Sequence, residues 1–150
     1  MLVGEPDDLF ERGKIADLPE GYRPSDDEPY MNPRQLEYFR RKLLRWREEI
    51  LRGSDLTLRR LQEDSERPTD PADWASAEAE RYYELRTRDR ERKLLAKIDA
   101  ALRRIEEGTY GFCEETGEPI GLARLEARPV ATLSVEAQER RERRERAYRR

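Results

Sequence analysis

The fold of this 150-residue chain is decided by residues 33–50, PRQLEYFRRKLLRWREEI. Apolar side chains recur there at alternating steps of three and four, at Leu36, Phe39, Leu43, Trp46 and Ile50. That is the heptad spacing of a helix that packs along one side against a partner helix. Asn32 can cap such a helix, and Pro33 suits its first position. We therefore predict a helix over residues 33–66, about 50 Å long at a rise of ~1.5 Å per residue.

A second helix is predicted after a short break. Residues 67–71, RPTDP, interrupt the first helix, and the second begins at or just after Asp70, with Pro71 at its first position. It runs to about Glu107, where Gly108 ends it. Its apolar residues are Trp74, Leu85, Leu95, Ile98, Leu102 and Ile105, the last four again at three-four spacing. Two helices of similar length predict a mainly α fold, built on a long antiparallel two-helix coiled-coil hairpin over residues 33–108 with its tip at 67–73.

The segments on either side of the hairpin differ from it in composition. Residues 1–32 are rich in glycine and proline and predict an irregular N-terminal segment that packs on the globular part, with a short helical turn around residues 9–15. Residues 109–133 contain turn residues and a few apolar ones, which indicates a small irregular core. Ser134 can then cap a last, very polar helix that runs to about Arg149. Residues 109–150 would thus form a small globular domain and a C-terminal helix.

Composition excludes several classes of function. Charged residues make up 43% of the chain, yet the net charge is only -3, so the basic footprint of a direct DNA binder is missing. There is no histidine, which removes the commonest general base and a principal zinc ligand. The one cysteine cannot form an internal disulfide, and no apolar run approaches the length of a membrane span. We expect a cytoplasmic, non-catalytic protein.

The region after the hairpin carries a resemblance to a known family. Residues 110–113 (YGFC) and 120–129 (IGLARLEARP) resemble the C-terminal finger of the DksA/TraR family, and the similarity extends over about residues 29–145. The resemblance implies a bacterial transcription factor that binds RNA polymerase rather than DNA.

The family's zinc site is degenerate in this chain. The family usually carries Cys-x2-Cys-x17-Cys-x2-Cys, and the matching positions here are Cys113, Thr116, Ser134 and Ala137. A structural zinc needs four donors, normally thiolate or imidazole, so we predict that no zinc is bound. Other contacts must then hold the finger, and the candidates are Tyr110, Phe112, Ile120, Leu125 and Leu133. Cys113 itself is expected to be a small buried apolar side chain.

The hairpin tip has a structural and a functional interpretation. Asp70 can cap the second helix, and Asp73 favours the positive end of the helix dipole. The resemblance implies more: the hairpin enters the secondary channel of RNA polymerase, where the matching acidic pair, followed by Ala75, acts close to the active site. The two roles are compatible, because a capping carboxylate keeps further lone pairs.

Basic residues of the second helix also have two interpretations. Arg86, Arg88, Arg90, Arg92 and Lys93 can be a solvated face paired with Glu84, Asp89 and Glu91. The resemblance implies that Arg90 helps polymerase binding, and that Leu94, Lys97 and Arg128 match a site for the alarmone ppGpp. A lysine common at that site is Gln138 here, which predicts a weakened response to ppGpp in the stringent control of promoters such as those of ribosomal RNA.

Two alternatives remain open at this point. A secondary-channel factor that stimulates transcript cleavage would need the tip acids to hold a second magnesium ion. A coiled-coil adaptor would use the heptads to form oligomers, whereas the resemblance leads us to expect a monomer.

Overall fold

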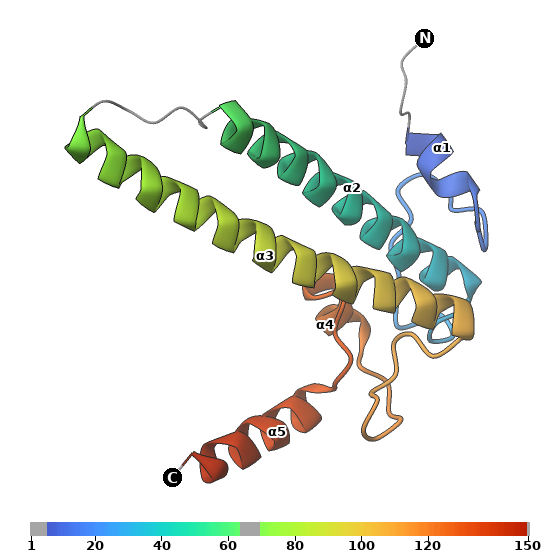
Figure 1. Cartoon of the computed structure of the whole chain (residues 1–150). Helices are drawn as coiled ribbons and strands as arrows, with labels where there is room; N and C mark the ends of the chain where they lie inside the picture. Colours follow the sequence, from blue (N-terminus) through green and yellow to red (C-terminus); the bar gives the residue numbers. More distant parts are fainter. Residues whose placement is uncertain (1–5, 64–69, 150) are drawn as a thin grey trace. The chain divides into compact units, whose positions relative to one another are not determined.

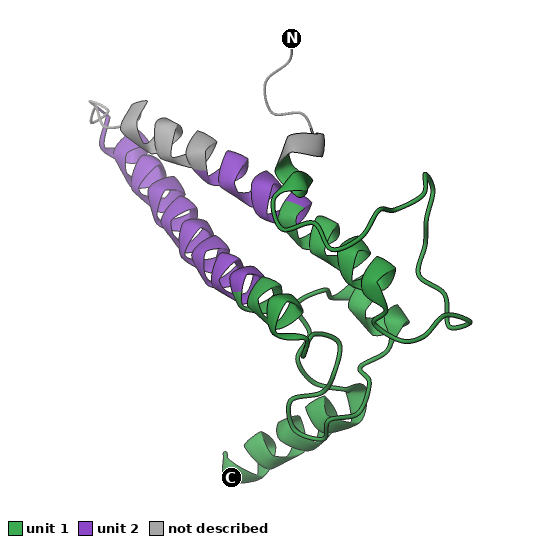
Figure 2. Cartoon of the chain, turned by 90° about the vertical axis from the view of Figure 1, so that its right-hand side faces the viewer, with its two compact units in different colours: residues 1–44, 100–150 green, residues 45–99 purple. Residues whose placement is uncertain are grey.

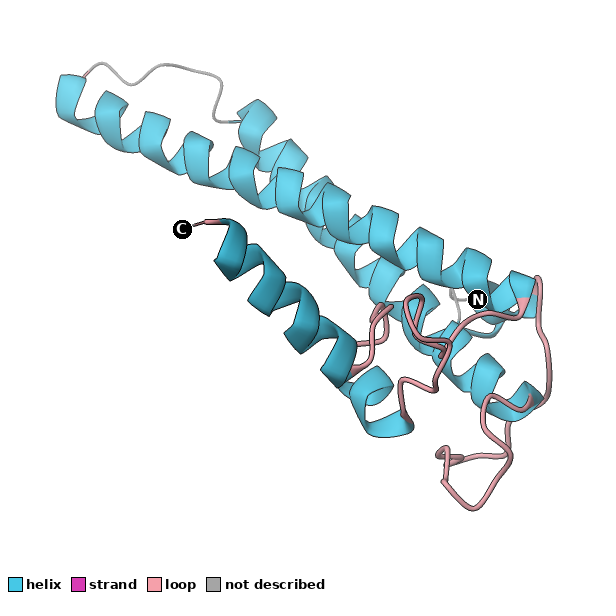
Figure 3. Ribbon diagram, turned by 90° about the horizontal axis from the view of Figure 1, so that it is seen from below, coloured by secondary structure: helices cyan, strands magenta, loops and turns pink. Residues whose placement is uncertain are grey.

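The fold is mainly helical, as predicted. The computed structural model describes residues 6–63 and 70–149, and it describes side chains from Leu9 to Ser54 and from Asp70 to Arg149. In these ranges the helices are α1 (Pro6–Glu11), α2 (Pro33–Glu63), α3 (Pro71–Glu107), α4 (Leu122–Ala127) and α5 (Val135–Tyr148) (Figures 1 and 3). The described extended structure is one isolated bridge between Phe112 and Pro119. Among the described helices, none is both long enough and apolar enough to cross a membrane.

The chain divides into two compact units, and α2 and α3 each contribute to both (Figure 2). Unit 1 comprises Met1–Leu44 and Ala100–Arg150, and unit 2 comprises Arg45–Asp99. The predicted helix 33–66 extends in the described part to Glu63, and residues 64–69 of the predicted first helix and tip lie outside the described residues.

The helix ends lie where local side-chain chemistry predicts them. The side chain of Asn32 accepts the backbone N–H of Arg34 at 2.9 Å, which caps α2. Gly108, with a φ of 80°, ends α3 in the left-handed conformation that glycine adopts without strain. At α5, the side chain of Ser134 accepts the N–H of Ala137 at 3.2 Å. These three predicted boundaries are confirmed.

The core of unit 1 combines α2, α3 and the finger. Its buried apolar residues are Phe10, Phe39, Leu43, Ala101, Ile105, Tyr110, Cys113, Ile120, Leu125, Val130, Ala131, Leu133 and Ala137. Of the predicted heptad positions in α2, Phe39 and Leu43 are fully buried, while Leu36 is half-buried. Phe39 also contacts the ring of Tyr110, with ring centroids 5.8 Å apart. The heptad residues at the start of α2 thus pack directly against the finger.

A buried ion pair ties the N-terminal segment to α2 within unit 1. Glu37 is fully buried and accepts the backbone N–H of Ile15 at 3.0 Å. Arg40 bonds both oxygens of Glu37 at 3.0 Å and donates to the carbonyl of Phe10 at 2.9 Å. The short helix of this segment is Pro6–Glu11 rather than the predicted 9–15, because Gly13 turns the chain with a φ of 86°.

In unit 2, α2 and α3 run antiparallel. Arg47 forms an ion pair with Asp99 at 2.8 Å, and Ser54 donates its hydroxyl hydrogen bond to Glu91. From Arg47 to Ser54 the chain advances seven residues along α2, while their partners on α3 go back eight residues, from Asp99 to Glu91. This is the pattern of an antiparallel pair. Ile98 is fully buried, whereas Trp74 and Leu85 of the same helix are exposed.

Candidate functional site

Exposed carboxylates lie in the first turn of α3. Asp70 accepts the N–H of Ala72 at 3.0 Å through Oδ1, and its carbonyl accepts the N–H of Trp74 at 2.9 Å, so it is the N-cap of α3. Asp73 is the acidic residue of the first turn, and Asp70, Asp73 and Ala75 are all exposed. Both carboxylates are therefore open to contact by a partner. The rest of the predicted tip, residues 67–69, lies outside the described residues.

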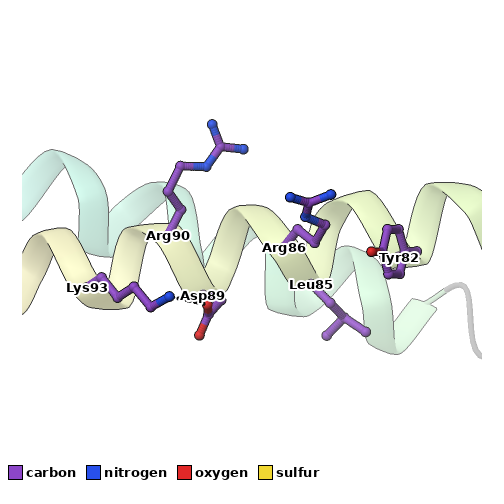
Figure 4. Close-up of a pocket in the computed structure, with 6 residues that line it drawn as sticks. All are labelled: Tyr82, Leu85, Arg86, Asp89, Arg90 and Lys93. Atoms are coloured by element: carbon purple, nitrogen blue, oxygen red, sulfur yellow. Dashed lines mark ion pairs between the residues drawn. The ribbon is translucent and has the colours of Figure 1, made fainter. Parts of the chain in front are cut away.

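Farther along α3, six side chains line a shallow surface depression of about 480 Å³ (Figure 4). They are Tyr82, Leu85, Arg86, Asp89, Arg90 and Lys93. The guanidinium carbon of Arg86 lies 5.7 Å from the centroid of the Tyr82 ring, a cation–π distance. Asp89 pairs with Lys93 at 3.2 Å and with Arg92 at 3.9 Å, which confirms part of the predicted local pairing. Arg90, which also lines the depression, is exposed.

The predicted ppGpp residues belong to different units. Leu94 and Lys97 lie in unit 2, where Leu94 is half-buried and Lys97 is exposed. Arg128 lies in unit 1, is exposed, and follows α4 as its C-cap. Gln138 donates to Glu142 at 3.1 Å on α5. A single site made of these residues therefore stays a prediction.

In the finger, hydrogen bonds join the sulfur of Cys113 to two of the other three degenerate ligand positions, Thr116 and Ser134. The sulfur of Cys113 accepts the hydroxyl of Thr116 and backbone N–H groups that include that of Ser134. Burial acts to raise the pKa of Cys113, but these hydrogen bonds outweigh it and lower the pKa to about 6. Cys113 is buried as predicted, and its sulfur also accepts these hydrogen bonds.

This donor set does not fit a structural zinc ion. Cys113 offers one thiolate, Ala137 offers a methyl group, and the hydroxyl oxygen of Ser134 already accepts the N–H of Ala137. The hydroxyl oxygen of Thr116 likewise accepts the N–H of Glu118 at 3.2 Å. Among the described residues, no group of three or more aspartate, glutamate, cysteine or histidine side chains is arranged to hold a metal. Four thiolate or imidazole donors are thus not available at this position.

Hydrogen bonds to backbone atoms link the finger to Tyr30 and to α3. The hydroxyl of Tyr30 donates to the carbonyl of Gly111 at 2.7 Å and accepts the N–H of Gly121 at 2.9 Å, which links both sides of the turn. Arg104 of α3 donates to the carbonyl of Phe112 at 2.9 Å. The predicted holders Tyr110, Ile120, Leu125 and Leu133 are buried, and Phe112 is half-buried against Tyr30 with ring centroids 5.5 Å apart. Sequence reasoning missed Tyr30 because its partners lie 81 and 91 residues away.

Comparison with known proteins places these features in one family. Residues 35–105 match the family model described as "DnaK suppressor protein DksA, N-terminal domain", and residues 108–143 match "Prokaryotic dksA/traR C4-type zinc finger". The chain is 70% identical over 128 residues to the RNA polymerase-binding transcription factor DksA of Caulobacter vibrioides, covering 85% of this chain and 90% of that protein. It is 44% identical over 117 residues to the Escherichia coli K12 protein of the same name, covering 78% of each.

A solved structure agrees with the sequence matches. The structure of transcription factor DksA2 from Pseudomonas aeruginosa superposes with a TM-score of 0.73 at 49% identity, covering 83% of this chain and 94% of that one. Both halves of the family pattern, the paired helices and the finger, are thus matched in sequence. On these grounds the chain belongs to the DksA/TraR family, as a member with one cysteine in its finger.

Proposed function

We propose that this chain is a non-catalytic transcription regulator that binds RNA polymerase through the secondary channel and modulates initiation, including at ribosomal RNA promoters. The observation that carries the proposal is the 70% identity, over 85% of the chain, to a protein named an RNA polymerase-binding transcription factor. Because bacterial RNA polymerase works in the cytoplasm, the proposal places the protein there. It acts as a monomer and does not recognise a DNA sequence.

The acidic start of α3 is the part that acts near the polymerase active site. Asp70 and Asp73 are exposed there, and the cap that Asp70 forms fixes where its carboxylate points. Asparagine caps a helix about as well as aspartate does. Replacing both residues by asparagine therefore removes the charge and keeps the helix start.

The test is transcription from a ribosomal RNA promoter with purified polymerase. Wild type should inhibit, and the variant Asp70→Asn, Asp73→Asn should bind polymerase without inhibiting. The matched control is Glu136→Gln, Glu139→Gln, which neutralises two exposed acids at the start of α5. Equal inhibition by wild type and the tip variant would count against a role for the tip, and stimulated cleavage in stalled complexes would favour the transcript-cleavage alternative.

The proposal includes co-regulation by ppGpp, with Leu94, Lys97 and Arg128 at the polymerase interface. Lysine and arginine can pair with phosphates, and Gln138 stands where a further cation is common. The response to ppGpp is therefore weakened, and Gln138→Lys should increase the synergy of protein and ppGpp in the same assay. Unchanged synergy would argue against the role given to this position.

The proposal also includes a finger that works without a metal. Two observations support this part of the proposal. The four ligand positions do not offer the donors that zinc needs, and Tyr30, Arg104 and Ser134 form hydrogen bonds within the finger.

A further inference from the structure

Met31 joins the N-terminal segment to the finger within unit 1. It is half-buried, and among the described residues other than glycine it alone has a positive φ, of 55°. Its backbone N–H donates to Oε1 of the fully buried Gln35 at 2.8 Å. Residues other than glycine keep this left-handed conformation only where their surroundings hold it. The contacts of Met31 therefore fix where its side chain lies.

The thioether of Met31 lies against the backbone of Gly111. Gly111 is buried with a φ of 90°, and a Cβ atom at that position would come within 2.8 Å of Cγ and 2.9 Å of Sδ of Met31. The hydroxyl oxygen of Tyr30 lies 3.3 Å from the same point. The methionine sulfur thus fills the space beside Gly111 and lies near the hydroxyl group that bonds to the finger.

The oxidation state of this sulfur affects what the Tyr30 hydroxyl can bond. In the structure the hydroxyl donates to the carbonyl of Gly111 at 2.7 Å and accepts the N–H of Gly121 at 2.9 Å. A thioether sulfur is only a weak acceptor, so it does not compete for the hydroxyl hydrogen. A sulfoxide is polar, and its oxygen would compete for that hydrogen at close range.

We propose that Met31 is an oxidation site, and that conversion of its thioether to a sulfoxide loosens the finger. The oxidant is a peroxide. With hydrogen peroxide, a sulfur lone pair attacks one oxygen, the S–O bond forms as the O–O bond breaks, and the departing hydroxide takes the remaining proton and leaves as water. Sulfur loses two electrons and the peroxide gains them. A methionine sulfoxide reductase reverses the change.

The sulfoxide weakens the finger for two reasons. Its added oxygen enlarges a side chain that already lies directly against the backbone of Gly111, and close packing leaves little room for an extra atom. It also draws the hydroxyl of Tyr30 away from its place between Gly111 and Gly121. The inference goes beyond the proposed function and does not depend on it, because it concerns the stability of the free protein.

The test is peroxide treatment of the whole chain carrying Cys113→Ala, which removes the one thiol. Mass mapping of fragments separates Met31 from Met1, the other methionine. Oxidation of Met31 should lower the melting temperature by about 2 °C or more, as the loss of one buried hydrogen bond would. Methionine sulfoxide reductase with a thiol reductant should restore it.

Two further variants in the Cys113→Ala background serve as controls. Met31→Leu keeps an apolar side chain of similar volume without the sulfur, so peroxide should leave its melting temperature unchanged. Tyr30→Phe already lacks the hydroxyl, so oxidation of Met31 should lower its melting temperature by clearly less than in the parent. Two changes that act through one bond are not additive.

Several results would overturn the proposal. One is oxidation of Met31 without a fall in melting temperature, and another is a Met31 that stays intact under conditions that oxidise free methionine. An equal fall in Met31→Leu would assign the effect to another residue. An equal fall in Tyr30→Phe would show that the hydroxyl is not involved. Each readout is made without polymerase, so the proposed function is tested separately.

Discussion

At the scale of single residues, the sulfur of Cys113 has a chemistry set by its neighbours. Hydrogen bonds from Thr116 and from backbone N–H groups outweigh burial and hold the pKa of Cys113 at about 6, below its ordinary value of 9.0. The thiolate absorbs near 240 nm, and the chain has no other cysteine, so a pH titration of that absorbance should give a midpoint near 6. A midpoint between 8 and 9 would contradict the hydrogen-bonded thiolate.

The sign of the associated stability change follows from the same pKa. A group whose pKa is lowered by folding adds stability above its unfolded pKa, and that stability is lost as the pH falls through the folded value. The difference in melting temperature between wild type and Cys113→Ala should therefore decrease as the pH is lowered from 9 to 6. Thr116→Val, which removes the hydroxyl donor, should raise the pKa of Cys113.

Tyr30 supports the finger through its hydroxyl group. Tyr30→Phe leaves the Gly121 N–H without this partner, while the Gly111 carbonyl still accepts the N–H of Ile120 at 2.8 Å. One unsatisfied group costs about 1–3 kcal/mol of unfolding free energy. Urea unfolding should show a loss in that range. Tyr148→Phe, at the exposed end of α5, should show none.

Single residues also mark where sequence-based prediction stops. Phe39 and Leu43 are buried as the heptad spacing predicts, but Glu37 and Arg40 are buried beside them. Their partners include the N–H of Ile15 and the carbonyl of Phe10, which are 22 and 30 residues away. Periodicity treats a charged side chain as solvated, and only the fold of the N-terminal segment supplies the partners that satisfy these two.

At the scale of elements, helix boundaries were predictable because their signals are local. Asn32, Gly108 and Ser134 each act within four residues of themselves. By contrast, α4 was predicted as irregular structure. Its six residues are too few for a period, and no side-chain hydrogen bond caps it at Gly121.

The start of α3 allows its structural and functional roles to be separated. Asp70→Ala removes the acceptor for the N–H of Ala72 and should lower the unfolding free energy by about 0.5–2 kcal/mol. Asp70→Asn should leave stability nearly unchanged, because asparagine caps equally well. Circular dichroism at increasing urea concentrations measures both. If Asp70→Asn destabilises as much as Asp70→Ala, charge rather than capping holds the helix start.

At the scale of the whole molecule, charged and apolar residues are divided unevenly between the two units. Thirteen of the fourteen buried apolar side chains described belong to unit 1, and Ile98 alone belongs to unit 2. The high share of charged residues in the chain, 43%, is consistent with the exposed helices of unit 2. The finger in unit 1 has enough apolar side chains to form a core. The family pattern in the sequence indicates both parts and predicts the apolar residues that hold the finger, but the hydrogen bonds of Tyr30 and Arg104 to the finger came only from the structure.

At the same scale, we predict that the finger keeps its stability without a metal, and this can be measured directly. Metal binding supplies much of the folding free energy of a four-cysteine finger, so removal of the ion destabilises it. Here the bonds of Tyr30, Arg104 and Ser134 need no ion, and prolonged dialysis against EDTA should leave the melting temperature unchanged within about 1 °C, a shift well below that caused by 1 kcal/mol. A four-cysteine member of the family should lose stability under the same treatment. Stoichiometric zinc by elemental analysis, or a lower melting temperature after EDTA, would contradict the hydrogen-bonded finger; Cys113→Ala would then show whether the lone thiolate holds that ion.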